Sequence, residues 1–314
     1  MTRRIFLPVV AGPTASGKTA CAVELCKLLN GEVVSADSMQ LFCGMEILSA
    51  APEAGERRGI AHHMIGIAQP SEPMSAWAYR DLAVRAIEDV AACGKQPVVC
   101  GGTGLYIDAI TKPMRFSDQS DPAVREELRE IAAQPGGRER LHQMLSAFDP
   151  ESAGRLHPND VRRVARAIEV FRLTGVTLTE QNRIDAARRG DFDEMIFAVD
   201  RPREELYARI DRRVDEMVER GLLREVRALM RLYEEHPTAI QAIGYKEIAA
   251  ALRGEARLPD AILQMKQATR NYAKRQLTWL RRDPRTIWIA ASNRSPEALA
   301  SEMFGIINDR RKNG

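Results

Sequence analysis

Two groups of residues near the N-terminus could carry chemistry. The first is Gly12-x-x-x-x-Gly17-Lys18-Thr19, which has the spacing of a phosphate-binding loop. Its glycines let backbone N–H groups approach phosphate oxygens, Lys18 can reach the terminal phosphates, and the Thr19 hydroxyl is a predicted Mg²⁺ ligand. We expect a diphosphate or nucleotide to bind along the whole loop, which comprises Gly12, Pro13, Thr14, Ala15, Ser16, Gly17, Lys18 and Thr19.

The second is a carboxylate, Asp37, which follows the apolar run Glu32 to Ala36. At the end of a strand beside a phosphate loop, it could accept a proton or hold a metal through water. An aspartate there could also form a helix cap or an Asx-turn, but the neighbouring loop favours function. Asp200 follows another apolar run and resembles the metal-binding acid of an NTPase. From this pattern alone, a kinase or NTPase therefore remains an alternative function.

Five short apolar runs predict the strands that position these groups. They are Ile5 to Ala11, Glu32 to Ala36, Pro97 to Cys100, Met195 to Val199 and Thr286 to Ala290. Helical stretches separate them, which predicts a doubly wound α/β sheet with helices on both faces. Ligands of such sheets bind at the carboxyl ends of the strands. The phosphate loop is expected there, between the first strand and a helix over Lys18 to Leu29.

Between Lys112 and Glu194 the pattern becomes helical. Asp121 and Pro122 predict a helix start, and further helices are expected at 138–148 and 160–174. We therefore expect a helical insertion over 113–194 between two parts of a catalytic core, 1–112 and 195–314. Long helices are expected at 203–231 and 259–282, and a frayed polar tail at 308–314.

Composition narrows the class of protein. The 314 residues are 45% hydrophobic and 28% charged, which is typical of a soluble globular chain. A net charge of +3 does not by itself indicate a polyanion partner, and 5% aromatic residues argue against a stacking-rich single-strand binder. Five cysteines without a Cys-x-x-Cys pair predict a reducing, cytoplasmic location. No apolar stretch predicts a membrane span, and no heptad pattern demands a dimer.

Cationic residues are clustered rather than abundant. On the 160–174 helix, apolar residues share one face and three arginines point elsewhere: Arg162, Arg163 and Arg166. The stretch 261–282 contains no acidic residue, and its Lys266, Arg270 and Lys274 recur at four-residue spacing. This stripe suits phosphate-backbone contact or a wall of a diphosphate pocket. His62 and His63 lack partners at zinc spacing, so packing or hydrogen bonding is expected of them.

Seven motifs occur in an order that is specific to one family. They are GPTASGKT, SADSMQ, HHMI, GGTGLYI, RRVARAIEVF, QAIGYKE and RNYAKRQLTWLR. Together they resemble tRNA dimethylallyltransferase, the bacterial tRNA isopentenyltransferase family, over nearly the whole chain. The resemblance implies a P-loop kinase-like doubly wound parallel sheet with a helical insertion that binds tRNA.

The resemblance also implies a reaction. A dimethylallyl group passes from dimethylallyl diphosphate to the exocyclic amine of the adenosine 3′ to the anticodon, in tRNAs that read codons starting with U. Asp37 is implied as general base, Lys18 and Thr19 as catalytic residues, and Mg²⁺ as cofactor. The implied contacts to the anticodon stem-loop are Asp37, Ser38, Met39, Gln40, Thr103, Arg125, Arg162, Arg163, Val164, Ala165 and Arg166.

Some positions depart from the family pattern and leave details of the site open. Phe42, Ser49, Ala51 and Gly66 stand where the family often has Tyr, Thr, Lys and Asp. Three alternatives remain: an adenylate isopentenyltransferase, which uses a nucleotide acceptor; a small-molecule kinase or NTPase; and a noncatalytic RNA-binding protein. The insertion and the basic C-terminal stretch disfavour the first. The combination of phosphate loop and Asp37 disfavours the third.

Overall fold

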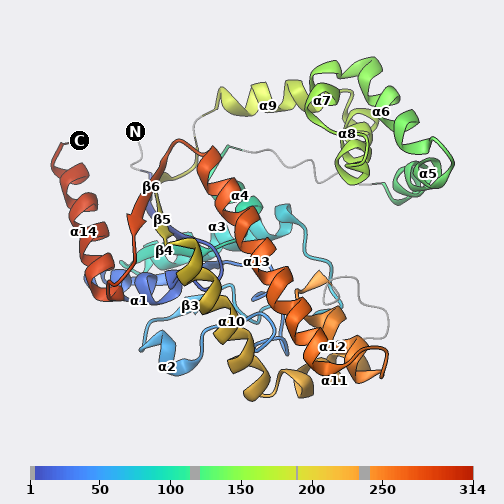
Figure 1. The fold of residues 1–314 in the computed structure, drawn as a ribbon. Coiled ribbons are helices and arrows are strands. Elements are labelled where there is room, and N and C mark those ends of the chain that lie inside the picture. Colours follow the sequence, from blue (N-terminus) through green and yellow to red (C-terminus); the bar gives the residue numbers. More distant parts are fainter. Residues whose placement is uncertain (1–3, 114–120, 189, 233–240, 314) are drawn as a thin grey trace. The chain divides into compact units, whose positions relative to one another are not determined.

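A computed structural model describes residues 4–113, 121–188, 190–232 and 241–313. The chain forms two compact units: Met1–Thr111 with Phe192–Gly314, and Lys112–Asp191 (Figure 1). The boundaries expected from the sequence lie within three residues of these. We refer to the first unit as the core and to the second as the insertion.

Within the described residues of the core, six parallel strands form one sheet in the order β3-β2-β4-β1-β5-β6. The five predicted strands are confirmed. The additional strand, β3, is two residues long and pairs with Val33 and Val34 at the sheet edge. The strands are β1 Phe6–Ala11, β2 Gly31–Ala36, β3 His62–His63, β4 Gln96–Gly101, β5 Asp193–Asp200 and β6 Thr286–Ala290.

Helices cover both faces of the sheet, as the alternation of elements predicts. Val10 of β1 points to the face covered by α1 (Lys18–Leu29) and α14 (Pro296–Asn313). Its neighbour Val9 points to the other face, where α3 (Ala76–Ala92) and α4 (Gly104–Thr111) pack. Because successive strand residues alternate in direction, the two faces bury separate apolar clusters.

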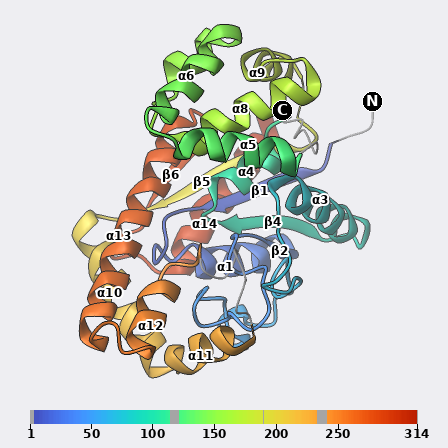
Figure 2. The same cartoon turned by 90° about the vertical axis from the view of Figure 1, so that its right-hand side faces the viewer.

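Four further helices group together beside the sheet (Figure 2). They are α10 (Arg203–Glu219), α11 (Leu222–Leu232), α12 (Tyr245–Leu252) and α13 (Leu258–Arg282). A separate short helix, α2, spans Ala54–Arg57. The single helix predicted over 203–231 is wrong, because Gly221 adopts φ 105° and separates α10 from α11. Only glycine takes this conformation without steric cost.

The insertion has its own helices and core. They are α5 (Pro122–Ala133), α6 (Gly137–Phe148), α7 (Pro150–Arg155), α8 (Val161–Thr174) and α9 (Leu178–Ala186). As predicted, Asp121 lies at the start of α5, where it caps the helix. Gly175 ends α8 with φ 71°. Leu128, Leu141 and Ile168 lie in its apolar core.

The C-terminus differs from the expected frayed tail, since α14 continues through Asn313. Its buried residues Leu299, Met303 and Ile307 pack in the same cluster as α1. These apolar residues therefore hold α14 against α1, and the helix continues from them into the polar segment. Across the described ranges, no helix has the length and apolar character needed to span a membrane.

Close packing of α13 on the start of α4 explains a glycine of the GGTG motif. A Cβ on Gly104 would lie 2.6 Å from Cε2 and 2.7 Å from Cγ of Trp279. The Trp279 indole N–H also donates to Asp108 Oδ2 at 3.2 Å, which fixes the ring against α4. A side chain at position 104 would therefore push α13 away from the sheet.

We predict that Gly104→Ala lowers the free energy of unfolding by about 1–3 kcal/mol, the usual cost of overpacking. Chemical denaturation monitored by circular dichroism measures the change. Gly305→Ala is the matched control, because Gly305 lies within α14 and a Cβ there meets open space. A Gly104→Ala variant as stable as the control would contradict this account of the packing.

Candidate active site

The phosphate loop connects β1 to α1 at the carboxyl end of the sheet, where the sequence places it. Ala15 at φ 61° and Gly17 at φ 94° are left-handed, so the loop turns its amides inward as an anion-binding nest. A Cβ on Gly12 would lie 2.7 Å from Ser16 Oγ, so the turn requires glycine there. Lys18 begins α1, whose N-terminus adds partial positive charge to the loop.

Lys18 is held inside the site rather than directed into solvent. Its ammonium donates to the Pro13 carbonyl at 3.4 Å. Burial lowers the pKa of Lys18, against the opposing influence of Cys100 and the Asp37 carboxylate. A buried ammonium with one weak carbonyl contact retains donors for an incoming anion.

Three arginines make hydrogen bonds to the phosphate loop, and sequence reasoning missed them. Arg201 Nε donates to Ser16 O at 2.7 Å, and Arg209 Nε to Ala15 O at 2.9 Å. Arg213 Nη1 donates to Thr14 Oγ1 at 3.3 Å. The three cations thus contact successive loop residues. Their four- and eight-residue spacing is the only sequence signal, and it is shared by many solvent-exposed helix faces.

Asp37 follows β2, the strand next to β4 in the sheet. Its Oδ1 accepts the Met39 amide at 3.0 Å, so the segment after the strand forms an Asx-type turn. Thr103 Oγ1 accepts the Ser38 amide at 3.0 Å, and Ser35 Oγ donates to Gln40 Oε1 at 2.9 Å. The structure therefore brings Thr103 together with the four predicted substrate contacts at 37–40. Those four residues follow β2, whereas Thr103 follows β4.

Gln276 of α13 joins the phosphate loop to the loop after β4. Its Oε1 accepts the Thr14 amide at 2.8 Å, and its Nε2 donates to Gly102 O at 2.9 Å. The side chain is 5% exposed, so both polar atoms are satisfied in a buried position. Because Gly102 precedes Thr103, this amide fixes the phosphate loop relative to the segment that carries Asp37.

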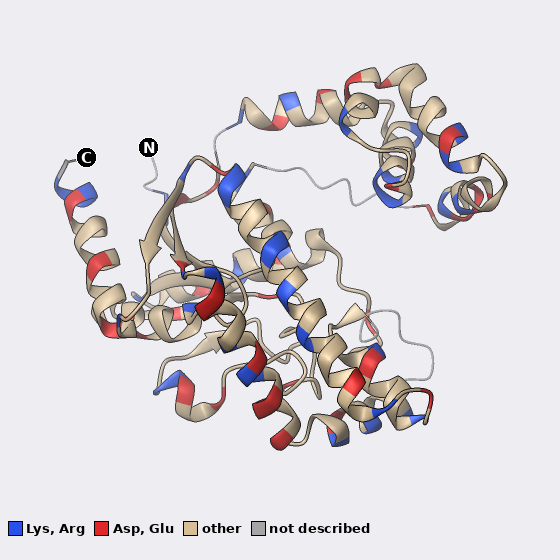
Figure 3. Ribbon diagram, viewed as in Figure 1, with Lys and Arg blue, Asp and Glu red and all other residues tan. Residues whose placement is uncertain are grey.

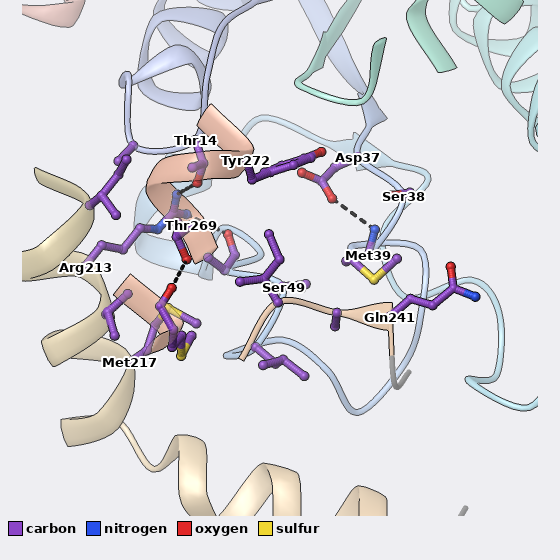
Figure 4. Close-up of a pocket in the computed structure, with 18 of the residues that line it drawn as sticks. Thr14, Asp37, Ser38, Met39, Ser49, Arg213, Met217, Gln241, Thr269 and Tyr272 are labelled. Atoms are coloured by element: carbon purple, nitrogen blue, oxygen red, sulfur yellow. Dashed lines mark hydrogen bonds between the residues drawn. The ribbon is translucent and has the colours of Figure 1, made fainter. Parts of the chain in front are cut away.

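A cavity of about 200 Å³ lies among these elements (Figure 4). Its polar lining residues include Thr14, Asp37 and Arg213. Its apolar lining residues include Leu48, Ile210, Val214, Met217, Ala242 and Met265. In Figure 4, Asp37 and Met217 lie on opposite sides of this pocket. The arrangement suits a ligand with a charged head and a short hydrocarbon tail.

Asp37 also lines a second, much smaller cavity of about 10 Å³. Oxygen-bearing side chains of Thr19, Ser35 and Gln40 surround it, together with Lys18. Asp200, the alternative acid from the sequence, lines neither of these two cavities. Its neighbour Arg201 supports the phosphate loop instead. The geometry therefore favours Asp37 over Asp200 as the functional carboxylate.

Arg213 carries its charge into the larger cavity. Burial lowers the pKa of its guanidinium, while the Asp37 carboxylate acts to raise it. Its Nη2 donates to the Ala50 carbonyl at 3.0 Å. The cation therefore faces a carboxylate in the same pocket, next to the phosphate loop.

The insertion places two of the predicted tRNA-contacting arginines on one buried carboxylate. Arg125 Nε lies 2.8 Å and Arg166 Nη1 2.7 Å from the oxygens of Glu169, which is 1% exposed. Arg162 is exposed, and Arg163 pairs with Asp160 at 3.3 Å. Sequence reasoning missed Glu169.

Val164 needs a correction as a predicted tRNA contact. Its side chain is 0% exposed and packs in the apolar core of the insertion. Ala165 is partly buried against the same core. The side chain of Val164 therefore stabilises α8 rather than presenting a surface to RNA.

The cationic stripe on α13 also differs from the expectation. Lys266 Nζ lies 2.8 Å from Asp215 Oδ2, and Arg270 Nε lies 3.0 Å from Asp211 Oδ1. Figure 3 shows acidic residues along α10 and basic residues along α13. Two members of the stripe therefore join helices, while Lys274 is exposed and Arg275 lines the larger cavity.

The four residues that depart from the family pattern are all described by the structure. Phe42 and Ala51 are buried, and Gly66 takes φ 60° in a turn. Ser49 lines the cavity, and its hydroxyl has no hydrogen-bond partner among the described residues.

The histidine pair makes hydrogen bonds, as expected. His63 Nε2 lies 2.6 Å from Glu32 Oε2, and His62 Nδ1 lies 2.9 Å from Ile60 O. No group of three or more His, Cys, Asp or Glu side chains suited to a metal occurs in the part of the chain that the structure describes.

Comparison with proteins of known sequence places these features in context. The chain is 44% identical over 301 residues to a tRNA dimethylallyltransferase of Geobacillus thermodenitrificans, covering 96% of this chain and 94% of that protein. It is 45% identical over 294 residues to a tRNA dimethylallyltransferase of Anaeromyxobacter dehalogenans, covering 94% and 97%.

Solved structures give the same result. A full-length tRNA isopentenylpyrophosphate transferase from Bacillus halodurans matches with a TM-score of 0.74 and 37% identity, over 99% of this chain and 98% of that one. A eukaryotic dimethylallyltransferase acting on tRNA matches with a TM-score of 0.81 and 29% identity, over 98% and 80%. The IPP transferase family model matches residues 40–283. Because its sequence and its fold both agree with these proteins, the chain belongs to the IPP transferase family.

Proposed function

We propose that this protein transfers a dimethylallyl group from dimethylallyl diphosphate to the exocyclic amine of the adenosine 3′ to the anticodon. The acceptors are tRNAs that read codons starting with U, and pyrophosphate is released. The main observation is one cavity lined by the phosphate loop, Asp37 and an apolar wall. The printed names of its relatives, which are tRNA dimethylallyltransferases, support the same choice.

The donor fits the mixed polar and apolar lining of the cavity. Arg213 offers donors and positive charge to a diphosphate head in this cavity, and Lys18 offers them from the smaller cavity that Asp37 also lines. The side chains of Leu48, Val214 and Met217 offer a dry surface to a five-carbon tail. A nucleotide triphosphate would instead place a polar ribose against this apolar wall, at a desolvation cost.

The proposed reaction forms one bond and breaks another. The adenine nitrogen attacks the allylic carbon as the bond from that carbon to the diphosphate oxygen breaks. Charge develops on the leaving oxygen, where Lys18, Arg213 and the loop amides stabilise it. Asp37 accepts the amine proton, so the product amine is neutral and the carboxyl group is protonated.

Mg²⁺ is proposed as the cofactor because the residues present suit it. Thr19, Ser35, Asp37 and Gln40 supply oxygen atoms around the smaller cavity, and oxygen is the ligand that Mg²⁺ prefers. Thr19 would hold the ion together with diphosphate oxygens. When bound, Mg²⁺ would offset negative charge on the leaving group.

The acceptor is proposed to be the anticodon stem-loop of tRNA. The adenosine must leave its stack to bring its amine to Asp37, and unstacking costs little free energy in a single-stranded loop. Arg125, Arg162, Arg163 and Arg166 of the insertion supply cations for the RNA backbone. We further propose that the protein acts as a monomer in the cytoplasm.

Purified protein, labelled dimethylallyl diphosphate, Mg²⁺ and an unmodified tRNA provide the direct test. We expect label in the tRNA at the adenosine 3′ to the anticodon. AMP in place of tRNA tests the adenylate isopentenyltransferase alternative, and ATP without donor tests the kinase or NTPase alternative. Labelling of AMP but not tRNA, or ATP turnover without prenyl transfer, would reject the proposal.

Asp37→Asn tests the base. The amide keeps an oxygen that can accept the Met39 amide but cannot take up the amine proton. We expect the single-turnover rate to fall by about 10²–10⁴-fold while tRNA affinity stays near that of the wild type. Asp309→Asn, an exposed substitution on α14, is the control. A near-normal rate would remove Asp37 from this role.

Arg162→Gln tests the contribution of the insertion to RNA binding. Removing one phosphate contact is expected to weaken tRNA binding and to reduce the slope of log affinity against log salt by about one. Filter binding between low and moderate salt measures both quantities. The exposed Arg253→Gln in the core serves as the control. An unchanged slope in Arg162→Gln would argue against a phosphate contact at this position.

A further inference from the structure

A carboxylate outside the cavity holds the loop that forms part of its wall. Glu225 of α11 accepts the Ile47 amide through Oε2 at 2.8 Å and the Leu48 amide through Oε1 at 2.7 Å. Leu48 lines the cavity, whereas Glu225 does not. Both carboxylate oxygens are therefore used to fix backbone that faces the site.

The loop that Glu225 holds is a compact turn over residues 45–51. Ser49 N donates to Met45 O at 2.8 Å, Ala50 N to Ile47 O at 2.9 Å, and Ala51 N to Glu46 O at 2.9 Å. Ala50 adopts φ 50°, which an alanine takes only when its surroundings impose it. The turn therefore needs support from outside itself.

The turn presents one carbonyl to the charged end of the cavity. Ala50 O accepts Arg213 Nη2 at 3.0 Å and Gln40 Nε2 at 3.4 Å. Arg213 also donates to Thr14, so its guanidinium spans the phosphate loop and the turn. A shift of the turn would remove one of the two contacts that aim this cation.

Glu225 is suited to the task because its charge is partly removed from water. Burial raises its pKa, while the bonds from the Ile47 and Leu48 amides act to lower it. Hydrogen bonds from amides to a carboxylate are roughly twice as strong as neutral ones. The two bonds thus restrain two consecutive peptide groups at once.

We propose that Glu225 is a positioning residue for the diphosphate head of the donor. It holds the 45–51 turn so that Ala50 O directs the Arg213 guanidinium into the cavity beside the phosphate loop. The inference rests on the proposed function in assigning a diphosphate to this site. It adds a residue that contacts neither substrate and acts through another side chain.

Glu225→Gln provides the first test. The amide has the same shape but offers a nitrogen, which cannot accept, to one of the two backbone N–H groups. We expect the Kd for inorganic pyrophosphate, measured by calorimetry, to rise about tenfold, as for one lost hydrogen bond. The kcat/KM for dimethylallyl diphosphate should fall similarly, because Arg213 also stabilises the leaving group, while the KM for tRNA stays near wild type. Glu219→Gln, an exposed change on α10, is the control.

A double-mutant cycle with Arg213→Gln tests the route of the effect. If Glu225 acts through Arg213, then Glu225→Gln adds little to the Kd for pyrophosphate once Arg213 has been replaced. Additive losses would overturn the inference, as would unchanged pyrophosphate binding in the single variant. A parallel loss of tRNA binding and thermal stability would mark Glu225 as a general structural residue and also overturn it.

Glu225→Asp covers the case in which the glutamine variant does not fold. The shorter carboxylate keeps its charge but cannot span both amides, so we expect a smaller rise in the Kd for pyrophosphate. A wild-type affinity in this folded variant would overturn the inference. Wild-type protein that binds pyrophosphate but transfers no prenyl group would reject the proposed function, while leaving the binding test of Glu225 intact.

Discussion

Parallel pairing of β2, β4 and β1 is the constraint on which the site depends. Because the three strands run in the same direction, the segments that follow them emerge at one edge of the sheet. The phosphate loop follows β1, Asp37 follows β2, and Thr103 lies just beyond β4. Gln276 then joins the first and third of these segments through one buried amide. Backbone topology brings the groups together, and α13 fixes their spacing.

Charge in this site is organised by separation of roles. Arg201 and Arg209 bind loop carbonyls from outside and so turn the loop amides toward the cavity. Arg213 lines the larger cavity and Lys18 lines the smaller one, and Asp37 lines both. Two of the cations therefore shape the loop, and two are available to a ligand. Apolar side chains of Ile210, Val214 and Met217 line the same cavity as Arg213, and low-dielectric surroundings strengthen electrostatic interactions.

Sequence reasoning recovered the parts of the fold that local patterns determine. Apolar runs identified the five longer strands, and the phosphate motif located the start of α1 at Lys18. It missed the break at Gly221, because one glycine in a helical pattern is not a sufficient signal. It also missed Arg201, Arg209, Gln276 and the partners of Lys266 and Arg270. These side chains meet groups distant in the chain, and nothing in their own neighbourhood specifies such partners. The roles assigned to Asp37, Lys18 and Thr19 stay predictions.

The shared carboxylate of the insertion has a consequence for the entropy of recognition. Arg125 and Arg166 are each held by Glu169 in the free protein, so their long side chains already occupy restricted rotamers. Immobilising such a side chain at an interface normally opposes association by about 0.5–1.5 kcal/mol. An RNA that engages this preorganised pair would forfeit little additional side-chain freedom, and the guanidinium planes would meet it in a defined orientation.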